Sequence, residues 1–367
     1  MGLPLLKTLD TLHRWTGGLI GLVLALLGLS GAILVHRDAW IMLPHAEDAR
    51  VEDFDAVARA TARMMASPDA RPQSIIYASD SFGLDRLTFA KGAGAYADQA
   101  GTIVTRWDSQ WARPEIWMFD FHHHLFAGDA GEVVIGIAGI CGLFFVVSGT
   151  ILWWRTRRTF EARLLPRRFS RPAILRHHRD LGIMAAALLL LSLYTGIAFI
   201  FRPVTTLVLG PGAPAAIEKA NKAPKAPSAK LSPDVDWAAI VRTAHARFPD
   251  AELRIVSLPR KDSGLISVRM RQPAEWLPNG RTMLWFAADS GRLVETRDAL
   301  AQPLQVRGFN LIYPLHAAKV GGLAYRLVMT LSGLALTLLG SLAAWSFWFA
   351  RPKPKPRKRP AQVAKAA

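Results

Sequence analysis

The chain has 367 residues, of which 51% are hydrophobic, and its 45 Lys and Arg against 28 Asp and Glu give a formal net charge of +17. This combination is too apolar for an ordinary soluble protein and is typical of a membrane protein. The basic residues flank apolar stretches and do not form one face of a domain, which argues against nucleic-acid binding. The single Cys141 excludes a disulfide framework and a Cys-x-x-Cys-His site for covalent haem attachment.

Four runs without a charged residue predict membrane-spanning helices. They cover 15–35, 133–154, 181–201 and 327–350, and each reaches the ~20 residues that a helix needs to cross the hydrocarbon core. The first run is longer than the ~7–15 apolar residues of a signal peptide, so we expect it to remain in the protein.

Basic residues at two places predict the orientation of the chain in the membrane. Nine arginines and one glutamate lie in 155–179, and seven basic residues without an acid lie in 351–367. The positive-inside rule places both segments in the cytoplasm, and an even number of spans places both termini there too. The segments between the first and second spans, and between the third and fourth, are then periplasmic.

Each periplasmic segment predicts a small α+β module with the same order of elements. In the first, a helical pattern that begins at Phe54 precedes strand-like pieces between 74 and 104. In the second, a helix over 237–248 precedes strands between 254 and 295. Two spans plus one module form a repeating unit, which indicates an internal duplication. The Pro-, Ala- and Lys-rich segment 211–233 predicts a flexible surface linker.

The predicted fold is therefore a four-helix transmembrane bundle with two small α+β periplasmic modules. We expect transmembrane helices over 10–36, 119–155, 177–202 and 311–350. The other segments are a first module at 37–118, a basic cytoplasmic loop at 156–176, a linker with the second module at 203–310, and a basic cytoplasmic tail at 351–367.

The first and third spans each open with a histidine that is followed by glycines at the same spacing. They are Gly17 and Gly31 after His13, and Gly182 and Gly196 after His178. Eighteen residues bring a helix back to the same face, so each histidine shares a stripe with its glycines, which predicts a narrow cleft beside an imidazole. Close helix packing explains the glycines equally well, and His177 could replace its neighbour His178.

A second group of histidines lies near the periplasmic ends of the second and fourth spans. It comprises His122, His123, His124 and His316. Imidazole is a common axial ligand of haem iron, and two such ligands from facing helices suit electron transfer. Helical periodicity favours His124, because it shares a face with Gly128 and Gly131. The three adjacent histidines could instead bind a soft or borderline metal ion directly, with His36 or His45 nearby.

The motifs around these histidines resemble those of a known family. His122-x-x-Leu125-Phe126-x-Gly128-x-x-Gly131 precedes the second span, and Pro314-Leu315-His316 precedes the fourth. With the alternation of spans and modules, the chain from 12 to about 348 resembles the PepSY-associated transmembrane proteins, and both modules look PepSY-like. Within this family the chain is most similar to the inner-membrane, haem-containing siderophore reductases of the ferrioxamine type.

The resemblance implies two b-type haems, each with two histidine ligands. The implied ligands are His13, His178, His122 and His316, so the resemblance prefers His122 where periodicity prefers His124. It also implies an oxidoreductase that reduces a ferric siderophore or another ferric chelate in the periplasm and so releases iron. Ala318 stands where the family is expected to have a small glycine after the fourth-span histidine.

These expectations combine into a path for electrons across the membrane. A quinol or a cytoplasmic reductase is the expected donor, because no Gly-x-Gly-x-x-Gly follows a strand and the loop 156–176 is too short for a nucleotide domain. Straight helices predict roughly 40–50 Å between the two histidine pairs, at about 1.5 Å per residue. The alternative is a non-redox protein whose modules restrain a periplasmic peptidase or assist envelope assembly.

Overall fold

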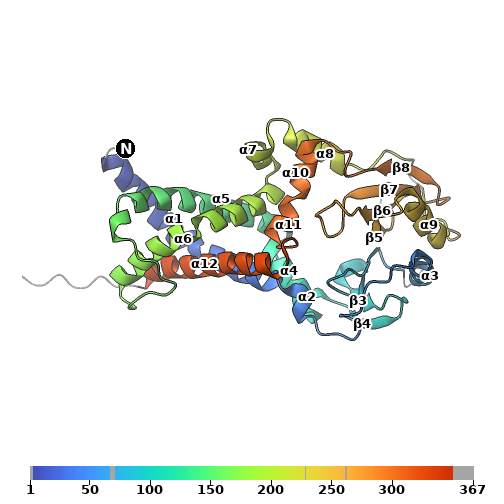
Figure 1. Cartoon of the computed structure of the whole chain (residues 1–367), viewed down its shortest axis with the longest axis horizontal. Helices are drawn as coiled ribbons and strands as arrows, with labels where there is room; N and C mark the ends of the chain where they lie inside the picture. Colours follow the sequence, from blue (N-terminus) through green and yellow to red (C-terminus); the bar gives the residue numbers. More distant parts are fainter. Residues whose placement is uncertain (1–2, 67–70, 228, 261–262, 350–367) are drawn as a thin grey trace, which may run out of the picture.

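The computed structural model describes residues 3–66, 71–227, 229–260 and 263–349. The predicted basic tail at 351–367 lies outside this part of the chain. Four long helices form a bundle, and a large antiparallel sheet lies beyond one end of it (Figure 1). We call this end of the bundle the sheet end. The opposite end, where the first helix begins and the second connects to the third, is called the loop end.

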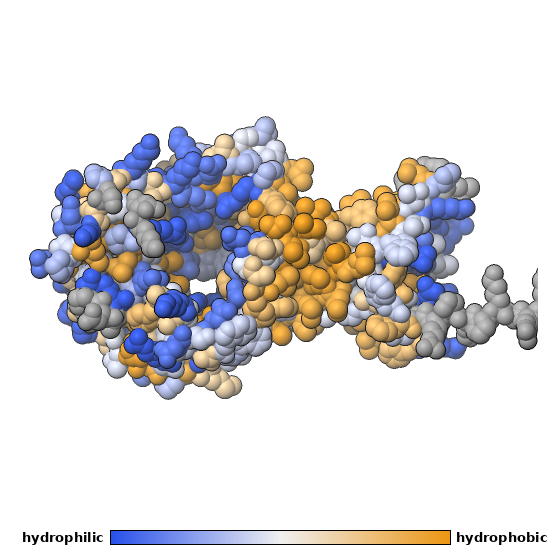
Figure 2. All heavy atoms as spheres, turned by 180° about the vertical axis from the view of Figure 1, so that it is seen from behind, coloured by the Kyte–Doolittle hydropathy of each residue, from blue (hydrophilic) through white to orange (hydrophobic). Residues whose placement is uncertain are grey.

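The bundle helices correspond to the four predicted spans. They are α1 (Leu3–Leu34), α5 (Gly128–Trp154), α6 (Arg171–Ile200) and α12 (Gly322–Trp348). All four are long and apolar enough to cross a membrane. Figure 2 shows a band of hydrophobic residues across the visible face of the bundle, next to the hydrophilic sheet region. The first and third helices begin earlier than predicted, since apolar runs mark the hydrocarbon-facing part of a helix and not its first turns.

Two of the predicted spans need correction, because each is a pair of helices. The segment 119–155 contains the end of α4 (Pro114–His124) and then α5, and the segment 311–350 contains α11 (Ile312–His316) and then α12. The chain turns between them through positive φ angles of 48° at Leu125, 61° at Phe126 and 50° at Ala318. Residues with side chains rarely adopt this conformation. The sequence sign of the breaks is the glycines that follow, Gly128 and the pair Gly321–Gly322, which also have positive φ.

The eight strands form one continuous sheet in the order β4-β3-β2-β1-β5-β6-β7-β8. The first four are β1 (Ser74–Ile76), β2 (Asp85–Thr88), β3 (Gly94–Ala97) and β4 (Ile103–Trp107). The others are β5 (Glu252–Ser257), β6 (Leu265–Arg271), β7 (Thr282–Ala287) and β8 (Leu293–Arg297). β1 pairs with β5 in antiparallel register, with Ile75 opposite Val256. The two predicted modules therefore share a sheet whose strand order is symmetric about this pair.

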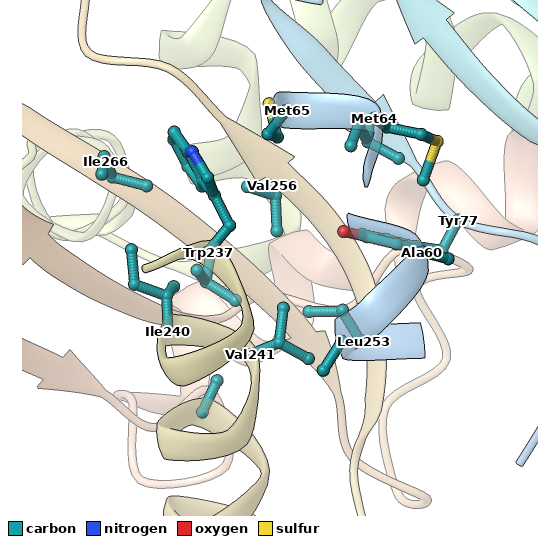
Figure 3. Close-up of a cluster of buried hydrophobic side chains, with 14 of the residues drawn as sticks. Ala60, Met64, Met65, Tyr77, Trp237, Ile240, Val241, Leu253, Val256 and Ile266 are labelled. Carbon is teal, nitrogen blue, oxygen red and sulfur yellow. The ribbon is translucent and has the colours of Figure 1, made fainter. Parts of the chain in front are cut away.

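Helices α3 (Phe54–Met65) and α9 (Trp237–Arg247) cover the sheet face that points away from the bundle. Each begins at an aspartate, Asp53 or Asp236, whose side chain accepts a hydrogen bond from a backbone N–H of the first turn. Figure 3 shows side chains of both helices packed over strand residues such as Val256 and Ile266. The alternation of inward and outward residues along the strands leaves the opposite sheet face turned toward the bundle.

The predicted flexible linker at 211–233 is partly helical. It contains α8 (Ala213–Asn221), in which Ala213 and Ile217 are fully buried in a cluster with Phe309 and Ile312. The prediction from composition was wrong here. Two apolar residues one helical turn apart are enough to hold a short helix in place when a neighbouring helix already offers an apolar surface.

Short helices connect the bundle to the sheet or lie within the connecting loops. The α-helices are α2 (Arg37–Trp40), α7 (Thr206–Leu209) and α10 (Leu304–Asn310). The 3₁₀ turns are η1 (Ala90–Gly92), η2 (Gln110–Ala112), η3 (Arg157–Thr159) and η4 (Arg202–Thr205).

Candidate functional site

Two pairs of histidines face each other inside the bundle. At the loop end, the rings of His13 on α1 and His178 on α6 have centroids 6.3 Å apart. At the sheet end, the rings of His122 on α4 and His316 on α11 also have centroids 6.3 Å apart. The four residues come from four different helices, so only the tertiary fold creates the pairs.

This separation fits two imidazoles on opposite sides of one metal ion. A histidine nitrogen binds a metal at about 2.0–2.1 Å, and the ring centre lies about 1.2 Å behind that nitrogen, so the two ring centres are then about 6.4–6.6 Å apart. Both pairs come within about 0.3 Å of that separation. Direct ring-to-ring stacking would instead bring the centroids nearer, as in the 3.9 Å stack of Phe119 on His123.

The tautomer of His13 follows from its hydrogen-bond partner. The hydroxyl of Ser148 donates to the carbonyl oxygen of Phe144 at 2.6 Å, which uses its only hydrogen. The same oxygen lies 2.8 Å from Nδ1 of His13, so it accepts a hydrogen bond from Nδ1–H. The lone pair of the His13 imidazole is then on Nε2, where it is free to bind a metal.

The sheet-end pair repeats this arrangement on both of its members. Nδ1 of His122 lies 2.9 Å from Oγ of Ser30, and Nδ1 of His316 lies 2.9 Å from Oγ1 of Thr195. Each hydroxyl also donates to a carbonyl of its own helix, so both imidazoles donate from Nδ1 and keep Nε2 unprotonated. Outer hydrogen bonds of this kind orient metal-bound histidines.

The hydroxyl partners were missed at the sequence level, although the sequence carries a signal for them. Ser30 follows His13 by seventeen residues, and Thr195 follows His178 by the same interval. Each is directly followed by a glycine of the predicted stripe. The hydroxyl residues at matched positions of the first and third spans therefore mark the helix turns that contact the sheet-end histidines.

The glycines of the predicted stripes divide between two roles. A Cβ added at Gly31 would lie 3.0 Å from Cε1 of His122, and one at Gly196 would lie 3.2 Å from Cε1 of His316. Gly17 and Gly182 instead face side chains of α12 at 3.9 Å, an ordinary contact distance. The glycines far from His13 and His178 thus make room for the histidines of the sheet-end pair.

A cavity of about 440 Å³ opens between the bundle helices at the sheet-end pair. This volume is within the ~300–1,000 Å³ of typical ligand pockets. Most of its wall is apolar, with residues such as Leu24, Leu193 and Leu336. Cationic side chains, among them Arg37, Arg202 and Lys319, line it as well. Arg37 and Lys319 already pair with Asp38, at 3.4 and 2.7 Å, and Glu132 also lines the cavity. The cavity therefore offers an apolar slot beside two imidazoles, with Arg202 as a cation that has no ion pair among the described residues.

Burial keeps the sheet-end imidazoles neutral. It lowers the pKa of His122 to about 3 and the pKa of His316 to about 4, with a smaller contribution from the neighbouring His123 in each case. A neutral imidazole is the form that binds a metal. Both side chains are in that form throughout the physiological pH range.

Of the three adjacent histidines at 122–124, only His122 faces a histidine of another helix. His124 bonds Asp120 at 3.1 Å, and His123 stacks on Phe119. Both line the cavity, but the ring opposite His316 is that of His122. At the loop end, the ring opposite His13 is likewise that of His178 and not that of His177.

The direct metal site built from the triplet has no support in the geometry. His36 bonds Oγ1 of Thr330 at 2.8 Å, and His45 bonds Asp48 at 2.7 Å. Within the described residues, no group of three or more His, Cys, Asp or Glu side chains is placed to hold a metal ion. The pairs His13–His178 and His122–His316 are therefore the candidate sites for a metal ion.

The two histidine pairs are closer along the membrane normal than straight helices predicted. α4 and α11 bring His122 and His316 against Gly31 and Gly196, inside the ends of α1 and α6. The interval from a loop-end histidine to the hydroxyl that contacts a sheet-end histidine is seventeen residues, or about 26 Å. The expected 40–50 Å is therefore corrected to roughly half of that value.

Comparison with known proteins supports the family that the motifs suggested. A family model described as the PepSY-associated TM region matches residues 11–351, nearly the whole chain. No curated protein matches the chain. The matched region includes both histidine pairs, the four bundle helices except the first residues of α1, and all eight strands. The chain belongs to the family of PepSY-associated transmembrane proteins.

Proposed function

We propose that the protein is an inner-membrane haem protein that carries electrons across the bilayer to a ferric chelate. The observation that carries the proposal is the pair of matched two-histidine sites, each with ring centroids 6.3 Å apart. Two imidazoles on one iron leave no open coordination position, which suits electron transfer. With no Cys-x-x-Cys-His in the sequence, the haems would be of the b type.

The residues of each site would hold and orient one haem. His13 and His178 would bind its iron at the loop end, and His122 and His316 would bind it at the sheet end. Gly31 and Gly196 leave room at the edges of the sheet-end imidazoles, and the cavity there offers apolar walls with a cation for a haem carboxylate. When bound, the haems would supply one-electron redox chemistry that crosses the membrane in two stages.

The proposed reaction balances with a quinol as the donor. One quinol gives up two electrons and two protons and becomes a quinone. Each ferric chelate accepts one electron and becomes a ferrous chelate, so one quinol serves two chelates. A cytoplasmic reductase is the other candidate donor. Ferrous iron binds hard oxygen ligands more weakly than ferric iron does, and the siderophore or other chelator then releases it.

The direction of transfer depends on the orientation, which is also part of the proposal. The arginine-rich connection between α5 and α6 lies at the loop end, and the positive-inside rule puts that end in the cytoplasm. The sheet and both PepSY-like modules are then periplasmic. The symmetric strand order and the repeated seventeen-residue interval support an internal duplication.

Absorption spectra of the purified protein test the haem assignment. We expect a Soret band and, after reduction with dithionite, the α-band of b-type haem. His122→Ala and His178→Ala should each remove about half of the haem, because each deletes one axial ligand of one site.

The neighbouring histidines provide matched controls. His124→Ala and His177→Ala change the same residue type within two positions, and both variants should keep the full haem content. A colourless protein with native helix content would refute the proposal and favour the non-redox alternative. Equal haem loss in the four variants would refute the ligand assignment.

A further inference from the structure

Four arginine side chains near the middle of the molecule are incompletely paired within the described residues, although Arg202 lies over the ring of Phe309 at 4.6 Å. Arg86, Arg202, Arg269 and Arg281 each keep a guanidinium nitrogen shielded from solvent without a hydrogen bond. None of these side chains forms an ion pair with the described residues. A half-buried charge without a partner is costly, so these positions are candidates for binding something anionic.

Strand geometry places two of them on the sheet face that points toward the bundle. Arg269 lies between Val268 and Met270, and Arg86 precedes Leu87. Those three apolar side chains are buried on the other face, in the core beneath α3 and α9. Because alternate residues of a strand point to opposite faces, both arginines point away from that core and toward the bundle.

The other two continue the row from the sheet to the cavity. Burial and, next, the charge of Arg281 lower the pKa of Arg269 to about 10. Burial and, next, the charge of Arg202 lower the pKa of Arg281. Arg202 itself lines the cavity together with His316. Arg269, Arg281 and Arg202 therefore follow one another in space from β6 to the sheet-end histidine pair. All three side chains stay protonated at neutral pH.

The acids near this row carry less charge than the arginines do. Glu275 accepts hydrogen bonds from the backbone N–H groups of Gln272 and Arg281 and from the hydroxyl of Thr282. On the other side, near Arg86, Glu115 pairs with Arg113 at 2.7 Å. Glu132 lines the cavity near Arg202 and offsets part of its charge. Within the described part of the chain, the four arginines and Arg113 therefore outnumber the three acids near them.

The row borders a space that a ligand can reach. Figure 2 shows an opening between the sheet region and the bundle, with hydrophilic residues around it. The cavity with the sheet-end pair lies on the bundle side of this opening, and the arginine-bearing sheet face lies on the other side. A molecule in this space would lie between the guanidinium groups and the sheet-end pair.

We propose that the space between sheet and bundle binds a ferric chelate that carries free carboxylates and a net negative charge, with Arg86, Arg269, Arg281 and Arg202 as its anion-binding groups. This rests on the proposed reductase function. Guanidinium groups bind carboxylates with two parallel hydrogen bonds, and a cleft lined by one sign of charge concentrates ligands of the other. A trihydroxamate chelate without negative charge gains nothing from them.

Binding of redox-inert gallium chelates to the full-length protein tests the proposal without any electron transfer. Titration calorimetry in detergent would compare gallium citrate with a gallium trihydroxamate of the ferrioxamine type. We expect the citrate complex to bind more tightly, and its affinity to fall as salt is raised. Arg269→Gln and Arg281→Gln should each weaken citrate-complex binding about tenfold or more and leave trihydroxamate binding unchanged.

Arg247→Gln serves as the control, since it removes the same charge from an exposed position at the end of α9, on the far side of the sheet. It should leave both affinities unchanged. Tighter binding of the trihydroxamate, or no change in the Arg269 and Arg281 variants, would overturn the proposal. So would loss of haem from these variants with unchanged chelate binding, because the guanidinium groups would then serve the haem carboxylates.

The two proposals fail separately. A protein without haem that still binds the gallium citrate complex through these arginines would refute the reductase function and leave the anion site in place. A haem protein that reduces only uncharged chelates would refute the anion site and leave the reductase function in place.

Discussion

At the scale of single residues, the hydroxyl groups beside the histidines decide what the imidazoles can do. Ser148, Ser30 and Thr195 each donate their hydrogen to a helix carbonyl and therefore accept one from an imidazole Nδ1. Among the described residues, His178 has no such hydroxyl partner. In the loop-end pair, only His13 donates a hydrogen bond to a hydroxyl. In the sheet-end pair, both His122 and His316 do.

If the two proposed haems are bound, this difference predicts separate effects on their potentials. Ser30→Ala removes an acceptor from His122, which makes the imidazole a weaker donor to ferric iron and should raise the midpoint potential of the sheet-end haem by tens of millivolts, at about 59 mV per tenfold change in relative affinity. Ser148→Ala should shift the loop-end haem in the same way. Potentiometric titration followed at the α-band measures both.

Thr195→Ser supplies the control for these variants, because it keeps the hydroxyl and removes only a methyl group. It should leave both potentials unchanged, whereas Thr195→Val should act as Ser30→Ala does. If the hydroxyl-free variants shift neither potential, the hydroxyls only fill space, and the tautomer argument fails.

At the scale of elements, the closest contact in the bundle joins α1 and α12. A Cβ at Gly28 would lie 2.6 Å from the carbonyl oxygen of Gly333, and one at Gly21 would lie 2.9 Å from that of Gly340. Small residues allow this approach of two backbones. Glycines thus serve close helix packing between α1 and α12, whereas Gly31 and Gly196 face imidazoles.

Gly28→Ala should therefore destabilise the bundle although alanine is the better helix former. The new methyl group meets backbone that cannot rotate away, so α1 and α12 must separate, at a cost of about 1–3 kcal/mol. Gly17→Ala is the matched control in the same helix, because its methyl group would meet only the Cβ of Ala343 at 3.9 Å. Thermal unfolding in detergent compares them, and equal stability would contradict the close contact.

At the scale of the whole molecule, the sheet region belongs to both halves of the chain. The pairing of β1 with β5 joins the strands that follow α1 to the strands that follow α6. Asp55 of α3 and Arg242 of α9 add an ion pair of 2.8 Å on the outer layer. Both halves of the chain therefore contribute to the single sheet next to the sheet-end histidines. The opening between this sheet and the bundle depends on both halves.

The proposed orientation predicts which side of the membrane can label the chain. In a Cys141→Ala background, Ser81→Cys lies in an exposed loop of the sheet region and Arg168→Cys lies in the exposed α5–α6 connection. A membrane-impermeant maleimide should label the first in cells with a permeabilised outer membrane. It should label the second only after the inner membrane is opened, and the reverse pattern would invert the proposed direction of electron transfer.

Much of the architecture was predictable because it depends on local patterns. The predicted helix that begins at Phe54, the helix over 237–248 and the strands after them agree with α3, α9 and β1 to β8 within a few residues. Alternation along a strand and an apolar run along a helix are properties of neighbouring residues, and solvent or lipid acts on them directly. The breaks at Leu125 and Ala318 were not predictable in this way, because tertiary contacts hold ordinary side chains at positive φ.

The sequence by itself determined the number of apolar helices, the order of the strands along the chain and the set of candidate histidines. The tertiary structure alone decided that β1 pairs with β5, that His122 and not His124 faces His316, and that His178 and not His177 faces His13. The competing histidines are the same residue type one or two positions apart, so they point in directions about 100° or 200° apart around a helix. Which one meets a partner depends on how another helix, distant in the sequence, packs against that face.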